Sequence, residues 1–322
     1  MKAWIINTLK EWPELKVVSD PDPEEARSII TLMASAINHR DLWITKGMYA
    51  GIQLPAVLGS DGCGMLNGKP VVINPGWYWG DNIKVQSSEF RVLGMPDQGT
   101  FAEKISVPEE YIFDKPEHLS MEEAAAIPLA GVTAYRTLIT KCQPVPENKV
   151  LITGIGGGVA LFAFQFALAY GCEVWCTSGT DLKIKKARDM GAAGGVNYTE
   201  TDWAECLLRK AGGFDIIIDS AGGDNFRHFI KLCNPGGKIA IYGATYGKWD
   251  GLNPQAVFWK QLSIFGSTMG SRQDFIDMLA FVSNYRIYPV VDSVFKFDEL
   301  YKGFERIQSG EQFGKIVFSH TS

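Results

Sequence analysis

A glycine-rich turn near the middle of the chain constrains the fold more than any other feature of the sequence. An apolar run at 150–152 leads through Thr153 into Gly154-Ile155-Gly156-Gly157-Gly158, and an apolar helical pattern begins at Val159. Glycines between a buried strand and a helix permit a tight turn and close approach of a pyrophosphate, which the N–H groups of the helix N-terminus can bind. The sequence therefore predicts a dinucleotide site at this turn. Its expected contacts are Gly154, Gly156, Gly157, Gly158 and Val159.

From the strand before this turn onward, strands and helices alternate along the chain. The predicted strands are 149–153, 173–177, 194–197, 214–219, 238–242 and 263–266. The predicted helices are 159–170, 181–190, 203–210 and 225–232, the second with Asp181 as its N-cap. Continuous apolar strands that alternate with amphipathic helices are typical of a parallel sheet covered on both faces.

The two ends of the chain have a different texture. Short strands broken by glycine or proline are predicted at 16–19, 28–35, 70–74, 101–107 and 111–114. A helix is predicted at 121–126, with Ser120 as its N-cap and acidic residues in its first turn. The tail alternates helices at 272–284 and 299–307 with strands at 290–294 and 315–319.

The length of 322 residues exceeds what one core usually supports, so we expect two domains. The predicted fold is α/β: a doubly wound parallel-sheet domain at 121–270, inserted into a mainly β domain built from 1–120 and 271–322.

Bulk properties exclude several classes of partner. The net charge of −5 argues against a nucleic acid or an anionic membrane, and the longest apolar run, 159–170, is too short to span a bilayer. The six cysteines contain no C-x-x-C pair, which predicts reduced, buried thiols. No secretory signal opens the sequence. We therefore expect a cytoplasmic protein that acts on a small molecule.

The strand at 173–177 bears on the choice of nicotinamide cofactor. NAD sites usually place Asp or Glu about 20 residues after the glycine turn, at the end of this strand. Here the strand ends in Ser178, which leaves room for a 2′-phosphate. Lys183 is the nearest cation, although it also fits a solvated helix charge, and Tyr198 is a further candidate contact. NADPH is favoured over NADH.

Together with the glycine turn, seven stretches carry a family resemblance: 38–41 (NHRD), 58–64 (LGSDGCG), 99–103 (GTFAE), 127–135 (IPLAGVTAY), 219–223 (DSAGG), 236–238 (GGK) and 314–317 (GKIV). In order and spacing the chain resembles the medium-chain dehydrogenase/reductase superfamily over essentially its full length. The resemblance implies a Rossmann-type domain inserted into a GroES-like catalytic domain, with NAD(P) as cofactor. It also implies a homodimer paired through an edge strand, here 262–267.

Some members of this superfamily bind zinc and others do not, so the positions of the zinc ligands can be compared with this sequence one by one. Zinc-dependent alcohol dehydrogenases have ligands where this chain has Asn38, Ser60 followed by Asp61, and Leu129. Their four-cysteine lobe would lie within 75–98, which contains no cysteine. Catalytic zinc requires three protein ligands, usually nitrogen or sulfur, and this set does not supply them. The sequence is similar to the zinc-independent branch of quinone and enone reductases, so we expect no metal.

Without a metal to polarise a carbonyl, acceptors that take hydride readily become the expected substrates. These are quinones and α,β-unsaturated carbonyls. Asn38 could bind the acceptor oxygen or the nicotinamide amide, and Tyr49 could donate a proton. His39 fits an acid or a ribose contact, and Asp41 fits a donor pair with His39 or a brace for its neighbours.

Further cofactor contacts are expected at the carboxyl ends of the parallel strands, where ligands bind in open α/β sheets. They are Gly243, Ala244, Ser267, Thr268 and Met269, and the resemblance adds Thr133. His118, His228 and His320 read as surface or helix residues without a role. Two alternatives stay open: an unusual NAD(P)-dependent alcohol or aldehyde dehydrogenase, and a weakly catalytic NADPH-binding sensor or structural protein.

Overall fold

The computed structural model describes residues 1–249 and 251–321, which form two compact units. Unit 1 consists of Met1–Val132 and Ser271–Ser322, and unit 2 of Thr133–Gly270. The sequence placed 121–132 in the nucleotide-binding region, whereas these residues belong to unit 1. The reason is packing, since Ala124 and Ala125 of α2 (Met121–Ala125) are fully buried and this helix contacts β3 and β5.

Unit 2 is built on a six-stranded parallel sheet with the order β13-β12-β11-β14-β15-β16. Its strands are β11 (Lys149–Ile152), β12 (Glu173–Ser178), β13 (Gly194–Asn197), β14 (Phe214–Asp219), β15 (Cys233–Ile241) and β16 (Ser263–Gly266). The order reverses at β11, whose two neighbours are β12 and β14. That switch point is where doubly wound sheets bind ligands beyond the carboxyl ends of their strands.

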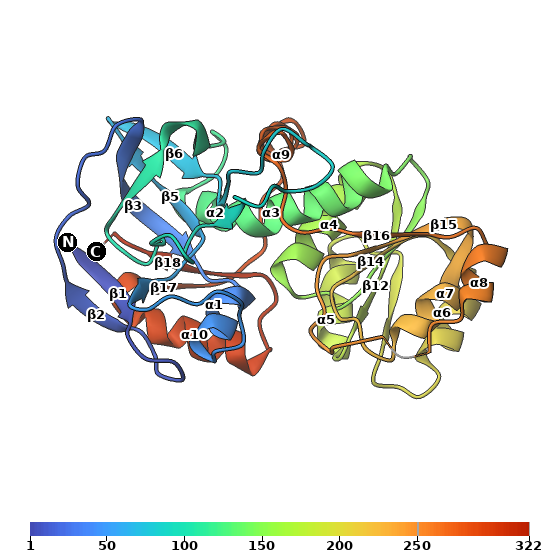
Figure 1. Cartoon of the computed structure of the whole chain (residues 1–322). Helices are drawn as coiled ribbons and strands as arrows, with labels where there is room; N and C mark the ends of the chain where they lie inside the picture. Colours follow the sequence, from blue (N-terminus) through green and yellow to red (C-terminus); the bar gives the residue numbers. More distant parts are fainter. Residues whose placement is uncertain (250, 322) are drawn as a thin grey trace. The chain divides into compact units, whose positions relative to one another are not determined.

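Helices cover both faces of this sheet, and several are labelled in Figure 1. They are α4 (Gly158–Ala169), α5 (Asp181–Asp189), α6 (Trp203–Ala211), α7 (Phe226–Leu232), α8 (Pro254–Trp259) and a π-helix at Arg136–Cys142. Leu151, Ile217 and Ile239 pack in one cluster with side chains of α6 and α7. Ile184 of α5 lies near Cys176, on the opposite face of the strands. The predicted doubly wound fold is confirmed.

Unit 1 contains a seven-stranded, largely antiparallel sheet with the order β10-β6-β5-β3-β18-β17, in which β9 also pairs with β3. Its strands are β3 (Arg27–Ala36), β5 (Asp61–Leu66), β6 (Lys69–Ile73), β9 (Lys104–Pro108), β10 (Ile112–Asp114), β17 (Val291–Lys296) and β18 (Lys315–Ser319). Smaller sheets pair β1 (Lys2–Ile6) with β2 (Glu14–Val17) and β4 (Ala56–Val57), and β7 (Gly76–Trp77) with β8 (Arg91–Val92). The helices are α1 (His39–Thr45), α2, α9 (Arg272–Asn284) and α10 (Leu300–Ser309), with 3₁₀ turns at Glu109–Tyr111 and Phe297–Glu299. Helix α3 (Pro128–Tyr135) contains the boundary between the units.

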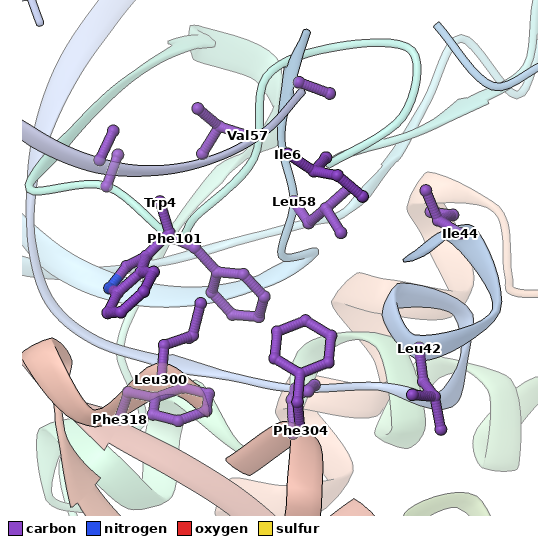
Figure 2. Packing of buried hydrophobic residues seen from close by; sticks show 14 of the residues in the cluster. Trp4, Ile6, Leu42, Ile44, Val57, Leu58, Phe101, Leu300, Phe304 and Phe318 are labelled. Atoms are coloured by element: carbon purple, nitrogen blue, oxygen red, sulfur yellow. The ribbon is translucent and has the colours of Figure 1, made fainter. Parts of the chain in front are cut away.

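The core of unit 1 joins the two ends of the chain (Figure 2). The Phe101 ring meets the Phe318 ring edge-on at 5.6 Å, and Trp4 Nε1 donates to the carbonyl of Phe297 across 2.8 Å. A Cβ at Gly303 of α10 would lie 2.2 Å from the Phe318 ring, so only glycine lets this helix approach β18 so closely. Residues almost three hundred positions apart therefore share one apolar core.

Helix starts test the capping predictions. Ser120 is the N-cap of α2, and its side chain accepts from the backbone N–H of Glu123, as the sequence predicts. The prediction for α5 is wrong by one residue. Thr180 is the N-cap and accepts from the N–H of Lys183, while Asp181 is the first helical residue, where its charge still favours the helix dipole.

The structure also bears on the expectations for the cysteines and for membrane-spanning helices. All six cysteines are free; Cys206 is half-buried and the others are buried. Within 1–249 and 251–321, no helix has both the length and the apolar character that a membrane span requires.

Candidate functional site

The glycine turn forms an open cradle at the N-terminus of α4. Gly154 and Gly156 have φ of 61° and 129°, values that favour glycine, and Gly157 is the N-cap of the helix. The turn is fixed on its strand side, since the N–H of Ile155 donates to the carbonyl of Thr177 across 2.8 Å. A Cβ at Gly154 or Gly157 would meet no atom within 4 Å. The cradle therefore has space for a phosphate group and N–H donors to bind it.

A buried carboxylate holds the strand before this turn. Asp219, the last residue of β14, is fully buried, and its Oδ1 accepts from Thr153 Oγ1 across 2.6 Å. Its Oδ2 accepts from the N–H of Gly222 across 2.8 Å. Burial raises the pKa of Asp219 above its ordinary value, and these hydrogen bonds oppose the shift. Asp219 thus links the end of β11 to the loop after β14, a role that the sequence prediction missed.

The loops after β14 and β15 are hydrogen-bonded to each other. The N–H of Tyr246 donates to the carbonyl of Ala221 across 2.7 Å, and the N–H of Gly223 donates to Gly247 across 3.1 Å. They border a pocket of about 550 Å³ lined by Tyr198, Gly222, Gly223, Asp224, Asn225, Tyr246 and Lys248.

Two predicted cofactor residues belong to the loop after β15. Gly243 lies so close to the preceding loop that a Cβ would be 2.9 Å from the carbonyl oxygen of Ser220, and Ala244 is exposed. Tyr246 and Lys248 were not predicted, although they follow the carboxyl end of the same strand.

The end of β12 brings the cofactor-selecting candidates together. Ser178 is buried, and its Oγ accepts from the N–H of Thr180 across 3.3 Å. Tyr198 follows the neighbouring strand β13, and its hydroxyl would be only 2.9 Å from a Cβ on Gly179. Tyr198 Oη also lies 3.3 Å from Tyr246 Oη, and burial with this contact raises the pKa of Tyr198 to about 12. Lys183 lies in the first turn of α5 and is half-buried.

The remaining cofactor candidates of unit 2 lie at the end of β16 and in α3. Thr133 is buried, with its Oγ1 3.9 Å from the sulfur of Met269. The N–H of Ser267 donates to Ile241 across 2.8 Å, and Thr268 is exposed. The buried Ser267 Oγ has no hydrogen-bond partner among the described residues, so a bound ligand could provide one.

In unit 1, the four catalytic candidates lie at the start of α1 and just after it. Asn38 is the buried N-cap of this helix, and its amide contacts Lys315 and Asp61. His39 is exposed, with its ring centroid 6.2 Å from that of Trp43.

Asp41 is fully buried, and backbone donors occupy both of its oxygens. They accept from the N–H groups of Asn38 and Gly59 across 2.8 Å and 3.2 Å. Burial raises the pKa of Asp41 above its ordinary value, and the Arg40 charge and the two N–H groups oppose the shift. Of the two roles that the sequence left open for Asp41, these contacts favour the one in which its carboxylate holds neighbouring backbone in place.

Arg40 organises the remaining polar groups of this region. Its NH1 donates to Ser60 Oγ across 2.6 Å and to the carbonyl of Leu93 across 2.7 Å. Its Nε lies 3.4 Å from Tyr49 Oη, and its guanidinium lies over the Tyr49 ring, 5.0 Å from the centroid. Tyr49 is therefore held by a cation on its neighbouring helix.

The residues at the zinc-ligand positions do not form a metal-binding set. Asn38 and Asp61 contact the Lys315 ammonium, and Ser60 contacts the Arg40 guanidinium. Within the described ranges, no group of three or more His, Cys, Asp or Glu side chains could hold a metal ion. A catalytic zinc needs three such ligands, and this donor chemistry does not fit one.

Comparisons with known proteins agree with this architecture. Residues 24–117 match the family model "Alcohol dehydrogenase GroES-like domain", and residues 158–284 match "Zinc-binding dehydrogenase". The chain is 36% identical over 338 residues to the zinc-type alcohol dehydrogenase-like protein YogA of Leptosphaeria maculans, covering 94% of this chain and 93% of that one. The chain belongs to the medium-chain dehydrogenase/reductase superfamily.

Solved structures narrow the class of enzyme. An NAD-dependent alcohol dehydrogenase superposes with a TM-score of 0.93 at 34% identity, covering 100% of both chains. A quinone oxidoreductase from Thermus thermophilus, also solved with NADPH, superposes with a TM-score of 0.83 at 25% identity, covering 99% of this chain and 100% of that one. The protein is an NAD(P)H-dependent oxidoreductase, and the predicted superfamily, fold and enzyme class are confirmed.

Proposed function

We propose that the protein is a zinc-independent, NADPH-dependent reductase that transfers hydride to a quinone or an α,β-unsaturated carbonyl. The observation that carries this proposal is the side-chain set at the zinc-ligand positions. Asn38 and Ser60 each face a buried cation, Lys315 and Arg40 respectively. Lys315 occupies the Asn38 oxygen and Asp61, and Arg40 occupies the Ser60 hydroxyl. These positions therefore offer a metal no set of three free ligand atoms, and in this proposal the acceptor takes hydride without a Lewis acid.

The preference for NADPH rests on the end of β12. No carboxylate follows this strand where NAD enzymes usually place one, because Ser178 occupies that position. The hydroxyl of Tyr198 lies against the adjacent Gly179, and Lys248 lines the same pocket as Tyr198. A phenol and an ammonium group near this turn suit a 2′-phosphate, and Lys183 in the first turn of α5 adds a second cation. The solved quinone oxidoreductase with NADPH supports the same preference.

Each part of the chain then has a separate task. The cradle at 154–158 and the N-terminus of α4 bind the pyrophosphate, while the bound nicotinamide supplies the hydride. Asn38 donates a hydrogen bond to the acceptor oxygen. Tyr49, held by Arg40, lies on the segment that follows α1 and is the proposed proton donor.

Metal analysis and steady-state kinetics test this function together. We expect the purified protein to contain less than one zinc per ten chains and to keep its activity after chelation. It should oxidise NADPH with a quinone or an enone but not reduce simple aldehydes. One tightly bound zinc per chain whose removal abolishes turnover would overturn the proposal. Tighter binding of NADH than of NADPH, measured by quenching of tryptophan fluorescence, would overturn the cofactor assignment.

A second candidate follows from one comparison. The solved structure at 34% identity is described as an NAD-dependent alcohol dehydrogenase. If this chain shares that activity, it should oxidise alcohols with NAD⁺ and depend on added metal, which the same assays detect. Tight NADPH binding without turnover of any acceptor in a broad panel would instead indicate a sensor or structural protein.

Assembly and location complete the proposal. β16 is one of the two edge strands of the unit 2 sheet, and the superfamily resemblance implies a homodimer formed through it. Sedimentation of the purified protein tests this pairing. The free cysteines of the described chain fit a reducing cytoplasm, which fractionation of source cells tests.

A further inference from the structure

Three buried polar side chains of unit 1 form a closed network around Asn38. Lys315, the first residue of β18, has 4% of its surface exposed, Asp61 none and Asn38 7%. The Lys315 ammonium donates to Asn38 Oδ1 across 2.7 Å, to Asp61 Oδ2 across 2.9 Å and to the carbonyl of Ile37 across 3.0 Å. All three of its hydrogens are therefore used inside the protein, and none remains for a substrate.

This network fixes the orientation of the Asn38 amide. An ammonium group has only donors, so the amide must turn its oxygen toward Lys315. Asn38 Nδ2 then donates to Asp61 Oδ2 across 2.9 Å. The reversed amide would set its N–H groups against the ammonium and its oxygen against the carboxylate, and both contacts would be repulsive. Asp61 cannot turn away, because its Oδ1 accepts from the N–H of Leu129 across 2.7 Å.

The amide of Asn38 retains one unused group. Nδ2 carries two hydrogens, and among the described residues Asp61 is its one hydrogen-bond partner. The backbone of Asn38 is also held, since its N–H donates to Asp41 Oδ2 across 2.8 Å. Asn38 can therefore offer a ligand the second hydrogen of Nδ2, whereas its Oδ1 is already occupied by Lys315.

We propose that Lys315 and Asp61 are positioning residues that present Asn38 as a fixed hydrogen-bond donor to the acceptor oxygen, and so select substrates whose oxygen gains negative charge. This inference rests on the proposed function. In the reaction, one hydride from the reduced nicotinamide adds to the acceptor, the cofactor is oxidised, and an electron pair moves onto the acceptor oxygen. Asn38 Nδ2–H stabilises that oxyanion until a proton from water or Tyr49 neutralises it.

The first test replaces the amide itself. Asn38→Asp keeps the size of the side chain and its pairing with Lys315, but it has no hydrogen to offer a ligand, because any proton that it retains is shared with the Asp61 carboxylate. We expect kcat with a quinone to fall by about 100-fold, because loss of one such donor in other enzymes costs about 10²–10³. The dissociation constant for NADPH should stay within about twofold of wild type, because in this proposal the Asn38 donor binds the acceptor and not NADPH. A kcat within about threefold of wild type would overturn the proposal.

The second test keeps Asn38 and removes the partners that fix the orientation of its amide. Lys315→Met removes the donor-only partner, and Lys315→Met combined with Asp61→Leu removes both charges where the single variant does not fold. Each variant should lower kcat by about tenfold or more, and Lys315→Arg, which still only donates, should recover most of that loss. Arg306→Met is the matched control. It breaks the paired contacts of Arg306 with Asp292, at 2.9 Å and 3.0 Å in the same unit, and should lower the melting temperature without changing kcat.

A binding measurement separates failure of this inference from failure of the proposed function. The probe is 4-nitrophenol with the protein–NADP⁺ complex, and its absorbance reports whether the bound form is phenolate or phenol. Wild type should favour bound phenolate, and Asn38→Asp and Lys315→Met should shift it toward phenol. A wild type that binds phenolate but reduces no quinone keeps the donor assignment and rejects the reductase. Equal phenolate binding by wild type and both variants rejects the positioning role.

Discussion

The hydroxyl of Thr153 donates to Oδ1 of Asp219 across 2.6 Å, between the strand that precedes the glycine turn and the last residue of β14. The second oxygen of Asp219 accepts from the N–H of Gly222 in the next loop, and the carboxylate is fully buried. The two loops that follow neighbouring strands at the switch point of the sheet thus share one carboxylate. A shared partner of this kind couples the position of the cofactor cradle to that of the pocket-lining loop.

Removal of this carboxylate should destabilise unit 2 and weaken cofactor binding. Asp219→Ala leaves the Thr153 hydroxyl and the Gly222 N–H buried without a partner, at a cost of about 1–3 kcal/mol each. Urea unfolding should therefore show a loss of about 2–5 kcal/mol. Asp219→Asn can still accept from Gly222 and donate to Thr153, so its loss should be much smaller. In a double-mutant cycle, Thr153→Val should cost less in the Asp219→Ala background than in wild type, and additive losses would contradict the coupling.

Gly157→Ser should separate cofactor binding from stability. Gly157 has φ of −75° and ψ of 152°, which serine adopts freely, and a Cβ there meets no atom within 4 Å. Serine is a better N-cap than glycine, so the melting temperature should stay equal or rise. The added side chain fills the open cradle and occupies a helix N–H, and we expect NADPH affinity to fall at least about tenfold. Asn253→Ser, at the N-cap of α8, is the control, and similar affinity losses in both variants would argue against a phosphate at the cradle.

Lys260 should contribute more to stability than its position at the protein surface suggests. Its ammonium donates to the carbonyls of Ile230, Lys231 and Cys233 across 3.0, 2.9 and 2.8 Å, at the C-terminus of α7. Cations stabilise this end of a helix, and hydrogen bonds to charged groups contribute about 1.5–3 kcal/mol, so Lys260→Met should cost about 1–3 kcal/mol. Lys231→Met, which removes only the half-exposed pair with Glu205, should cost less than about 1 kcal/mol. Equal unfolding midpoints for the two variants would contradict this role.

His320 should make the stability of unit 1 depend on pH. The sequence placed it on the surface, but its ring packs on Phe297 at 4.3 Å with Nε2 3.0 Å from Ser35 Oγ, and burial lowers its pKa from 6.5 to about 3. The folded state thus favours neutral imidazole, whereas the unfolded chain takes up a proton near 6.5. The free energy of unfolding is therefore highest above pH 6.5. It falls as the pH drops from 6.5 toward 3, by at most about 1.4 kcal/mol per pH unit.

The His320 prediction is measured by urea unfolding between pH 4.5 and 7. His320→Gln should show a flatter pH dependence than wild type. Equal slopes for His320→Gln and wild type would show that the imidazole is protonated as readily in the folded protein as in the unfolded chain.

Most of unit 2 follows from local sequence patterns. Apolar periodicity decides strand or helix within a few residues, and the glycine turn requires positive φ at positions that the sequence itself marks. In unit 1, the N-cap of α2 was predictable for the same reason, since a capping serine interacts only with its own first turn. The N-cap of α5 was misplaced because Thr180 and Asp181 are both good capping residues, and the strand geometry before them selects between the two.

The sequence singled out candidate catalytic residues, and it did not predict the partners of their side chains. Asn38, Asp41 and Tyr49 could be singled out from the sequence, and the residues at the zinc-ligand positions could be read directly. Lys315 belongs to one of the stretches that carry the family resemblance, but no sequence pattern placed its ammonium beside Asn38 and Asp61, which lie 277 and 254 residues away. Likewise, the boundary after Val132 depends on how α2 packs on β3 and β5, which no local pattern encodes.

The sequence by itself thus determined the dinucleotide-binding fold, the glycine cradle and the residues at the zinc-ligand positions, because each depends on short-range backbone geometry or on residue type alone. Only the tertiary structure decided which partners those residues have. The register of β18 against β3, and of β3 against β5, brings Lys315 to Asn38 and Asp61 and so fixes the direction of one amide. Strand pairing over such distances is set by the packing of the whole core, and a single side chain far along the chain can therefore orient the amide that we propose as the donor to the acceptor.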